Sequence, residues 1–300
     1  MGQPGVGPAG AVRRAADQQV DDLDAAAMDT ALHDAQERVA DAERCGIDVI
    51  TYFDDRFPQQ LRSVPSAPAV LWVRGNVQAL HEDLVAVVGT RSPSAFGRVA
   101  ADVVTSAAAE AGVGCVSGLA LGVDAVSHET ALRCGARTVA VLAGGVGEGE
   151  IHPAGHSALA ARIIRSGGCL VSENPPGTET LPRLLVARNR LQSGLALATV
   201  VVQTGLTGGT PHTARYSLAQ RRPLFCPVPR ERNDGTAGNW ALLEAPGRTL
   251  PDMMPAFRDA RGLCNRLADQ PAASGITRQS AAAWASALRR GDEHEPSSLF

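Results

Sequence analysis

The sequence of 300 residues contains no lysine, so all 28 of its basic residues are arginine. A phosphate-binding loop of the Walker A type is therefore excluded, because that loop depends on a lysine that contacts the β- and γ-phosphates. Any anion site in this chain must use arginine side chains, backbone N–H groups or the positive ends of helices.

Other absences exclude further classes of protein. The six cysteines, at positions 45, 115, 134, 169, 226 and 264, form no C-x-x-C pair, which predicts reduced thiols in a cytoplasmic protein. No apolar run has the length of a membrane span, and the N-terminus lacks the apolar core of a signal peptide. His152 and His156 are spaced like metal ligands on a helix, but no carboxylate stands at a matching offset, so we expect neither a metal nor another cofactor.

The net charge of −3 is unevenly distributed along the chain. Residues 1–84 hold 7 arginines against 14 acidic residues, whereas residues 85–230 hold 13 against 8, and residues 231–300 hold 8 against 9. The middle of the chain is therefore basic although the whole is acidic. This distribution predicts a local phosphate-binding surface within the middle region.

Four segments follow from composition and pattern. Residues 1–20 are rich in Gly, Pro and Ala and are expected to be disordered. Residues 21–83 form an N-terminal lead-in, with a helix over about 22–44 and short strands over 49–52 and 70–73. Residues 84–248 form the main domain. Residues 249–300 form a short C-terminal extension with two short helices and a tail.

Within the main domain, strand patterns alternate with helical ones. The strand candidates are 84–88, 113–117, 138–142, 169–172, 198–202 and 224–227, and the helices lie at about 95–111, 123–134, 154–166, 183–194 and 211–221. This alternation predicts βαβ units and an α/β fold, an extended Rossmann-like, doubly wound and mostly parallel sheet. Ligands of such sheets bind beyond the carboxyl ends of the strands, so we expect function in the loops there.

Four of the first five loops after these strands are rich in glycine, and we predict that all five form one phosphate-binding rim. The first loop carries Arg91 just before a helix that starts near Ala95, where free N–H groups and the helix end favour an anion. No G-x-G-x-x-G follows the first strand, so the dinucleotide-binding pattern is missing. The candidate phosphate-binding residues of these loops are Gly89, Thr90, Arg91, Ser92, Arg98, Gly118, Leu119, Gly208, Gly209 and Thr210.

The most basic stretch, residues 183–190, contributes Arg188, Asn189 and Arg190 as further candidates. Adjacent positions on a helix diverge by about 100°. Arg188 and Arg190 therefore cannot both face one point, and one of them is free to support structure instead.

These motifs together resemble the DprA/Smf family of DNA-processing proteins over about residues 46–246. The segments that carry the resemblance are FPQQLRSVPSAPAVLWVRG, VAVVGTRSPSAFGR, SGLALGVDAVSHETAL, GARTVAVLAGG, SENPPGTET, ARNRLQSGLA, ATVVVQTG, TGGTPHTA and AGNWALL. The resemblance implies an extended Rossmann-like fold, a homodimer, binding of single-stranded DNA and loading of a RecA-type recombinase during natural transformation. It also implies a DNA pocket built from Gly89-Thr90-Arg91 and Arg188-Asn189-Arg190.

The chain departs from the family pattern at several positions. Leu121 stands where the second loop of the family has arginine, and His152 stands where the third loop has tyrosine. Residues 208–214 replace the family's S-G-S-L-x-T-A segment, and residues 250–300 do not obviously form a winged-helix domain. A DprA-derived scaffold that has lost DNA binding therefore stays open as an alternative.

A second alternative is a Rossmann-like nucleotide-binding sensor or a relative of the phosphoribohydrolases. The segment from Gly208 to Thr210 lies where those enzymes begin their G-G-x-G-T-x-x-E motif. Residues 211–217, PHTARYS, contain neither the second Gly-Thr nor the glutamate. Because glycosidic-bond cleavage needs a carboxylate, and no catalytic constellation is complete, we expect a binding protein rather than an enzyme.

Overall fold

The computed structural model describes residues 25–244, which divide into two compact units between Cys45 and Gly46. The first unit contains α2 (Ala25–Arg44), the helix predicted over about 22–44. The segments expected to be disordered (1–20) and to form the C-terminal extension (249–300) lie outside the described residues. Within residues 25–244, no helix combines the length and the hydropathy needed to cross a bilayer.

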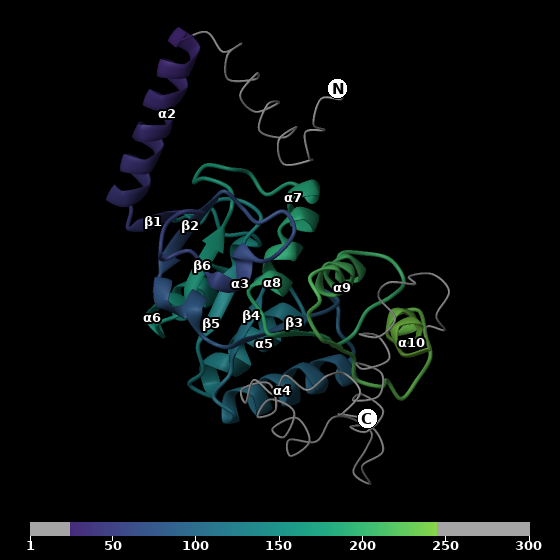
Figure 1. Ribbon diagram of the computed structural model, residues 1–300. Helices are drawn as coiled ribbons and strands as arrows, with labels where there is room; N and C mark the ends of the chain where they lie inside the picture. The colour runs from purple at the N-terminus through teal and green to yellow at the C-terminus, as the bar shows by residue number, and fades with distance from the viewer. Residues whose placement is uncertain (1–24, 245–300) are drawn as a thin grey trace, which may run out of the picture. The chain divides into compact units, whose positions relative to one another are not determined.

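The second unit is organised around an eight-stranded sheet (Figure 1) of order β1-β2-β6-β5-β4-β3-β7-β8. Six strands, from β6 across to β8, run parallel, and β1 and β2 are added antiparallel at one edge. The predicted α/β fold with a mostly parallel sheet is therefore confirmed. The strands are β1 (Ile47–Thr51), β2 (Val70–Gly75), β3 (Leu84–Val88), β4 (Gly114–Ser117), β5 (Thr138–Val141), β6 (Cys169–Ser172), β7 (Ala198–Val201) and β8 (Leu224–Phe225).

Helices cover both faces of this sheet, as a doubly wound fold requires. On β3, Val85 and Val87 pack in a cluster with α4 and α5, whereas Leu84 and Ala86 pack in a second cluster with α3 and α8. The central strand is therefore apolar at every position because both of its faces are buried. The helices are α3 (Gln59–Arg62), α4 (Ala95–Glu110), α5 (Val123–Arg133), α6 (Ser157–Arg165), α7 (Pro182–Ala187), α8 (Asn189–Gly194), α9 (Thr210–Ala219) and α10 (Ala237–Glu244), with 3₁₀ turns at Val77–His81 and Ala154–His156.

The sheet extends across the domain boundary that the sequence places at residue 84. Strand β2 pairs with β6, with Val73 opposite Val171, and β1 pairs with β2. Antiparallel strands need no crossover helix, so their addition leaves no βαβ pattern in the sequence. The helix predicted over 183–194 is in fact two short helices, α7 and α8, with Arg188 between them.

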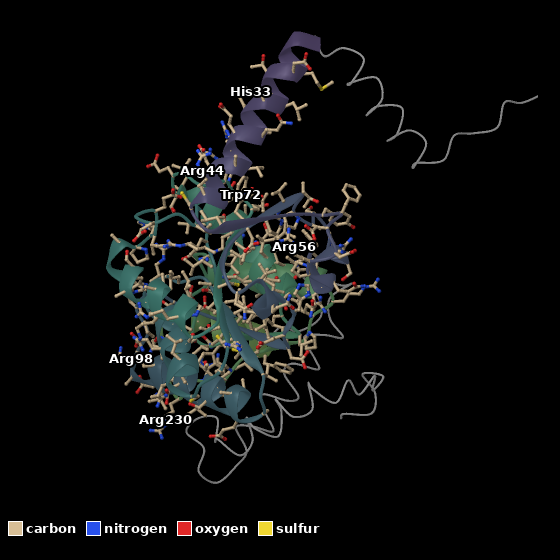
Figure 2. The ribbon with its side chains drawn as sticks, turned by 90° about the vertical axis from the view of Figure 1, so that its left-hand side faces the viewer. His33, Arg44, Arg56, Trp72, Arg98 and Arg230 are labelled. Carbon is tan, nitrogen blue, oxygen red and sulfur yellow. The ribbon has the colours of Figure 1, made fainter. Side chains whose placement is uncertain are left out.

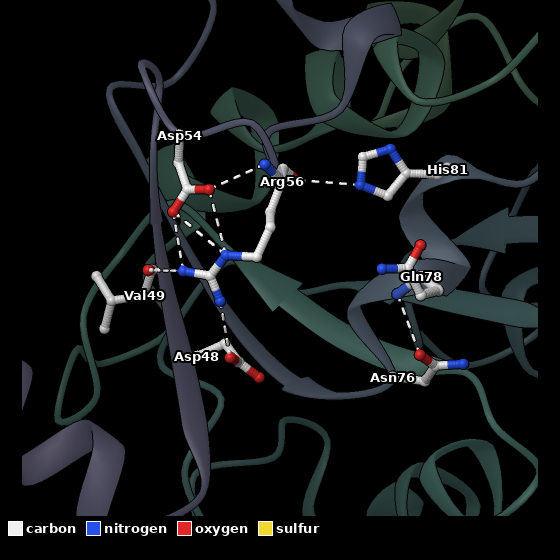
Figure 3. A network of polar contacts seen from close by, with 7 residues as sticks. All are labelled: Asp48, Val49, Asp54, Arg56, Asn76, Gln78 and His81. Atoms are coloured by element: carbon white, nitrogen blue, oxygen red, sulfur yellow. Dashed lines mark hydrogen bonds and ion pairs between the residues drawn. The ribbon is translucent and has the colours of Figure 1, made fainter.

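A side-chain network covers the free edge of the sheet at β1 (Figure 3). The Arg56 guanidinium donates to Asp54, to Asp48 Oδ1 (3.1 Å) and to the carbonyl oxygen of Val49 (3.4 Å). His81 Nε2 lies 3.0 Å from the carbonyl oxygen of Arg56 and donates to it. Arg56 thus donates to the Val49 carbonyl oxygen, which an added strand would otherwise use for pairing. Charged side chains commonly protect edge strands in this way.

Candidate functional site

The strand order reverses direction between β3 and β7, and a cavity of about 540 Å³ lies beyond the carboxyl ends of these strands. Chain connections diverge to opposite sides at such a point, which leaves a crevice suited to a ligand. The cavity is lined by Val88, Gly89, Thr90, Arg91, Ala120, Asp124, Pro182, Leu185, Val186, Arg188, Asn189, Gln192, Thr204, Gly205, Thr207, Gly208, Gly209, Thr210 and Thr213.

Hydrogen bonds to Gln203, in the loop after β7, hold the loop after β3 in place. Thr90 N–H donates to the carbonyl oxygen of Gln203 (2.8 Å), and the Gln203 side-chain oxygen accepts from both the N–H and the hydroxyl of Ser94 (3.0 Å each). Ser94 in turn caps α4 by accepting from Gly97 N–H (3.4 Å). A Cβ on Gly89 would lie 2.6 Å from Val123 Cγ2, so only glycine fits this close approach.

The loop after β4 has its polar backbone atoms already occupied. Asp124 Oδ2 accepts from Gly118 N–H (3.1 Å) and Ala120 N–H (3.3 Å), and His156 Nδ1 donates to Leu119 O (2.8 Å). Leu119 is buried and has a φ of 56°, a left-handed conformation that is rare outside glycine. Gly118 and Leu119 therefore lie behind the cavity wall. The sequence predicts that both residues bind phosphate, but in the structure neither of them lines the cavity.

Arg188 is the buried cation of the site, only 4% exposed. Its guanidinium donates to Gly118 O (2.9 Å), to Asn189 Oδ1 (3.0 Å) and to the carbonyl oxygen of Val141. Burial lowers the pKa of Arg188 to about 10, although the nearby Asp124 favours its charged form. Arg188 thus joins the loop after β4 to the end of β5 and contributes a positive charge to the cavity.

Asp124 is the acidic counterpart of Arg188 in the same wall. Its side chain is 6% exposed, and burial raises its pKa against the opposing effects of Arg188 and the two backbone N–H donors. Arg91, Arg188 and Asp124 are the charged residues among those that line the cavity. The cavity therefore holds two guanidinium groups against one carboxylate and attracts an anion.

Arg91 is the exposed cation at this cavity. Within residues 25–244, no hydrogen bond or ion pair joins its guanidinium to a protein group. The same positive charge opposes that of Arg188, whose pKa it helps to lower. A guanidinium without a protein partner, beside a second buried one, is available to a ligand carboxylate or phosphate.

The first turn of α9 forms another part of the cavity wall. Gly208, Gly209 and Thr210 line the cavity where α9 begins, and Asn189 Nδ2 holds this segment by donating to Gly209 O (3.1 Å). In this first turn Pro211 has no N–H and His212 N–H donates to Gly209 O (3.1 Å), so the turn offers an anion the N–H of Thr210 and the partial positive charge of a helix end. The structure thus brings together three predicted segments, Gly89–Arg91, Arg188–Asn189 and Gly208–Thr210.

Three other candidates lie outside this cavity. Arg190 forms a bidentate ion pair with Glu173 and donates to Ser66 O (2.9 Å), so it joins the lead-in segment to the loop after β6. Ser92 N–H donates to Thr90 Oγ1 (3.2 Å). Arg98 is exposed on α4 (Figure 2) and donates to Pro93 O (2.6 Å).

The third glycine-rich loop, Gly144–Gly149, also lies outside this cavity. Gly145 N–H donates to Thr178 O (3.0 Å), and Gly147 N–H donates to Glu150 Oε2 (3.3 Å). Most of its glycines are buried under these groups rather than open to a ligand. The sequence predicts that five loops form one phosphate-binding rim, but this loop donates the N–H groups of Gly145 and Gly147 to other protein groups and does not line the cavity.

Sequence reasoning missed Gln203, Asp124 and Gln192 as parts of the site. Gln203 lies two residues beyond the end of β7 and is buried at 4% exposure, so a polar residue at the end of the apolar run 198–202 was the available signal. The amide oxygen of Gln192 is assigned to the side that faces Gly118 and Arg188. In this orientation it accepts from Gly118 N–H (3.0 Å) and from the Arg188 guanidinium (3.3 Å). No sequence signal indicates this pairing. Among the described residues, no group of three or more His, Cys, Asp or Glu side chains is arranged to hold a metal.

Comparison with known proteins identifies relatives in sequence and in fold. A sequence model of the family described as DNA recombination-mediator protein A matches residues 48–253. Protein Smf of Escherichia coli is 37% identical over 187 residues, 62% of this chain and 50% of that protein. DNA processing protein DprA of Bacillus subtilis is 34% identical over 194 residues, 64% of each chain. The chain thus spans about half the length of some curated relatives and under two thirds of others.

Two solved structures share the fold. DNA processing protein A of Streptococcus pneumoniae superposes with a TM-score of 0.58 at 26% identity, over 79% of this chain and 74% of that one. The protein of the same name from Helicobacter pylori, whose structure is described as giving insight into its single-stranded DNA binding mode, superposes with a TM-score of 0.59 at 23% identity. That match covers 71% of this chain and 94% of the other.

Proposed function

The chain belongs to the DprA/Smf family of DNA recombination mediators, and from that membership we propose that it binds single-stranded DNA in the cavity between β3 and β7. The proposal includes a cytoplasmic homodimer that passes the strand to a RecA-type recombinase during DNA uptake and recombination. It assigns no catalytic step to the chain, because the proposed role consists of binding and delivery.

The observation that carries the proposal is Arg91, an exposed guanidinium beside the start of α9 and without a protein partner among the described residues. A phosphodiester placed between them would receive charge-assisted hydrogen bonds from the guanidinium and a further hydrogen bond from the N–H of Thr210. Contacts of this kind fix the position of a strand without reading its bases. Binding is therefore expected to be largely independent of sequence.

The size of the site favours a single strand over a duplex. A cavity of about 540 Å³ is within the range of pockets that hold one small molecule. A flexible single strand can turn one phosphate into such a space, whereas a stiff duplex keeps its phosphates on the outside of a cylinder. The same volume would also accommodate a free nucleotide, so the nucleotide sensor remains the second candidate and is included in the test.

The experiment is a salt titration of binding to a fluorescent oligothymidine, with a duplex of equal length and a panel of nucleotides measured beside it. We expect the oligothymidine to bind more tightly than the duplex, and its affinity to fall linearly with the logarithm of salt concentration. Binding of nucleotides but not of oligothymidine would replace the DNA proposal by the sensor. No binding to either would leave a scaffold without DNA-binding activity.

The homodimer is tested separately by sedimentation. We place the contact in the main domain because family resemblance implies it there. At tens of micromolar, roughly tenfold or more above the dissociation constants of many specific complexes, a dimer is expected. A monomer at that concentration would contradict the assembly without affecting the proposal for the cavity.

A further inference from the structure

A negative side chain occupies the wall of a cavity that otherwise attracts anions. Asp124 lies in the first turn of α5, and its Oδ2 accepts from Gly118 N–H and Ala120 N–H at 3.1 and 3.3 Å. These two hydrogen bonds hold the loop after β4 from behind the cavity wall. Asp124 itself lines the cavity, together with Arg91 and Arg188, so its negative charge acts on the same space as the two guanidinium groups.

The same carboxylate partly offsets the charge of the buried arginine. Among the described residues Arg188 forms no ion pair, and its guanidinium donates to backbone carbonyl oxygens and to the side-chain amide oxygen of Asn189. Asp124 nevertheless favours the charged form of Arg188, and Arg188 favours the charged form of Asp124. Removing the negative charge would leave both guanidinium groups of the cavity without an acidic neighbour in its lining.

We propose that the charge of Asp124 opposes a bound phosphate, so that this residue keeps the loop after β4 in place and at the same time limits the affinity of the cavity for DNA. This inference rests on the proposed DNA-binding function of the same cavity. A protein that delivers a strand must also release it, and a fixed internal anion lowers affinity at all times without any conformational change. Asp124 is thus an affinity-determining residue of the site.

The structural requirement at this position is for an acceptor and not for a charge. An asparagine has the same length, and its Oδ1 can accept from both Gly118 N–H and Ala120 N–H. A purely structural aspartate would therefore be replaced with little effect on binding, or with a loss. Only a carboxylate that opposes the ligand makes its neutral replacement bind more tightly.

The test compares Asp124→Asn with Glu129→Gln, using fluorescent oligothymidine as the probe at low and moderate salt. Glu129 is exposed on the same helix and does not line the cavity, so its replacement changes the net charge equally. A unit charge about 8 Å from a phosphate, in a medium with an effective dielectric constant near 20, changes affinity by tens of fold before screening by salt. We expect Asp124→Asn to bind about tenfold more tightly than the parent, and Glu129→Gln to stay within about twofold.

The outcomes separate this inference from the function on which it rests. If the parent binds oligothymidine and Arg91→Ala weakens it, but Asp124→Asn binds no more tightly than Glu129→Gln, the inference is rejected and the DNA-binding proposal stands. If the parent does not bind oligothymidine, both fall together. Asp124→Ser, which keeps a hydroxyl acceptor without charge, provides a second variant. Failure of both variants to fold, judged by thermal unfolding, would mean that the carboxylate is a structural necessity and would also reject the inference.

Discussion

Replacing Arg91 with alanine removes the exposed guanidinium at the mouth of the cavity and leaves its buried framework intact. The side chain makes no hydrogen bond or ion pair to another described residue, so its loss leaves no protein group unsatisfied. A hydrogen bond that involves a charged group contributes about 1.5–3 kcal/mol. Because Arg91 is solvent-exposed and screened, we take the lower part of this range, about 1.5–2 kcal/mol, which is roughly a ten- to thirtyfold loss of affinity.

The dependence on salt gives an independent measure of the same contact. Each phosphate that a protein neutralises on a single strand contributes about 0.7 to the slope of log K against log salt concentration. Arg91→Ala should therefore reduce the slope by about 0.7, and the loss should be similar for oligonucleotides of different sequence. Fluorescence anisotropy at four or five salt concentrations measures both quantities on one set of samples.

The matched control is Arg162→Ala, which removes an exposed arginine from α6, away from the cavity lining. This control should bind oligothymidine like the parent, and both variants should keep the melting temperature of the parent. Equal affinities of Arg91→Ala and the parent would refute the reasoning, because the loop after β3 would then be only a turn. A loss of the same size in Arg162→Ala would show that general charge, and not this site, governs binding.

Three further predictions concern the framework of the site. Arg190→Ala breaks the ion pair with Glu173, in which the arginine and glutamate side chains are 14% and 20% exposed. This change should lower the free energy of urea unfolding by about 2–3 kcal/mol. It should change DNA affinity less than Arg91→Ala does. Gly122→Ala should lower the melting temperature and weaken DNA binding together. Gly122 has a φ of 81°, and a Cβ there would collide with the carbonyl oxygen of Thr90. An unchanged melting temperature would contradict this prediction. Burial lowers the pKa of His128 to about 3. Below about pH 6.5 the histidine therefore binds a proton in the unfolded state but stays neutral in the folded state. The stability from His128 is therefore complete above that pH and should decline by about 1 kcal/mol per unit between pH 6 and 5, a slope that His128→Gln should remove in urea titrations at each pH.

The periodic features of the chain were predictable from its sequence. The strands Leu84–Val88 and Cys169–Ser172 match their predicted ranges, because a short apolar run between turn residues has one favourable place in a parallel sheet. The alternation with helices then determines the doubly wound arrangement, since parallel strands need crossover connections. The loops that carry Arg91 and Thr210 follow directly, because all carboxyl ends of such strands lie at one edge.

Only the tertiary structure decided which candidate side chains reach the cavity. The sequence shows Arg188 and Arg190 two residues apart but not that the first lies inside the cavity wall and the second is paired with Glu173, because that depends on where α8 begins. The third glycine-rich loop has the composition of an anion site, yet its Gly147 N–H donates to Glu150 and its Gly145 N–H donates to Thr178 O. Asp124 reaches Gly118 and Arg188 through contacts between separate elements, and distances of this kind do not follow from local periodicity. The sequence by itself thus determined the order of the strands along the chain and the edge at which we propose that a ligand binds, whereas side-chain packing across the sheet decided the charge and the shape of the cavity there.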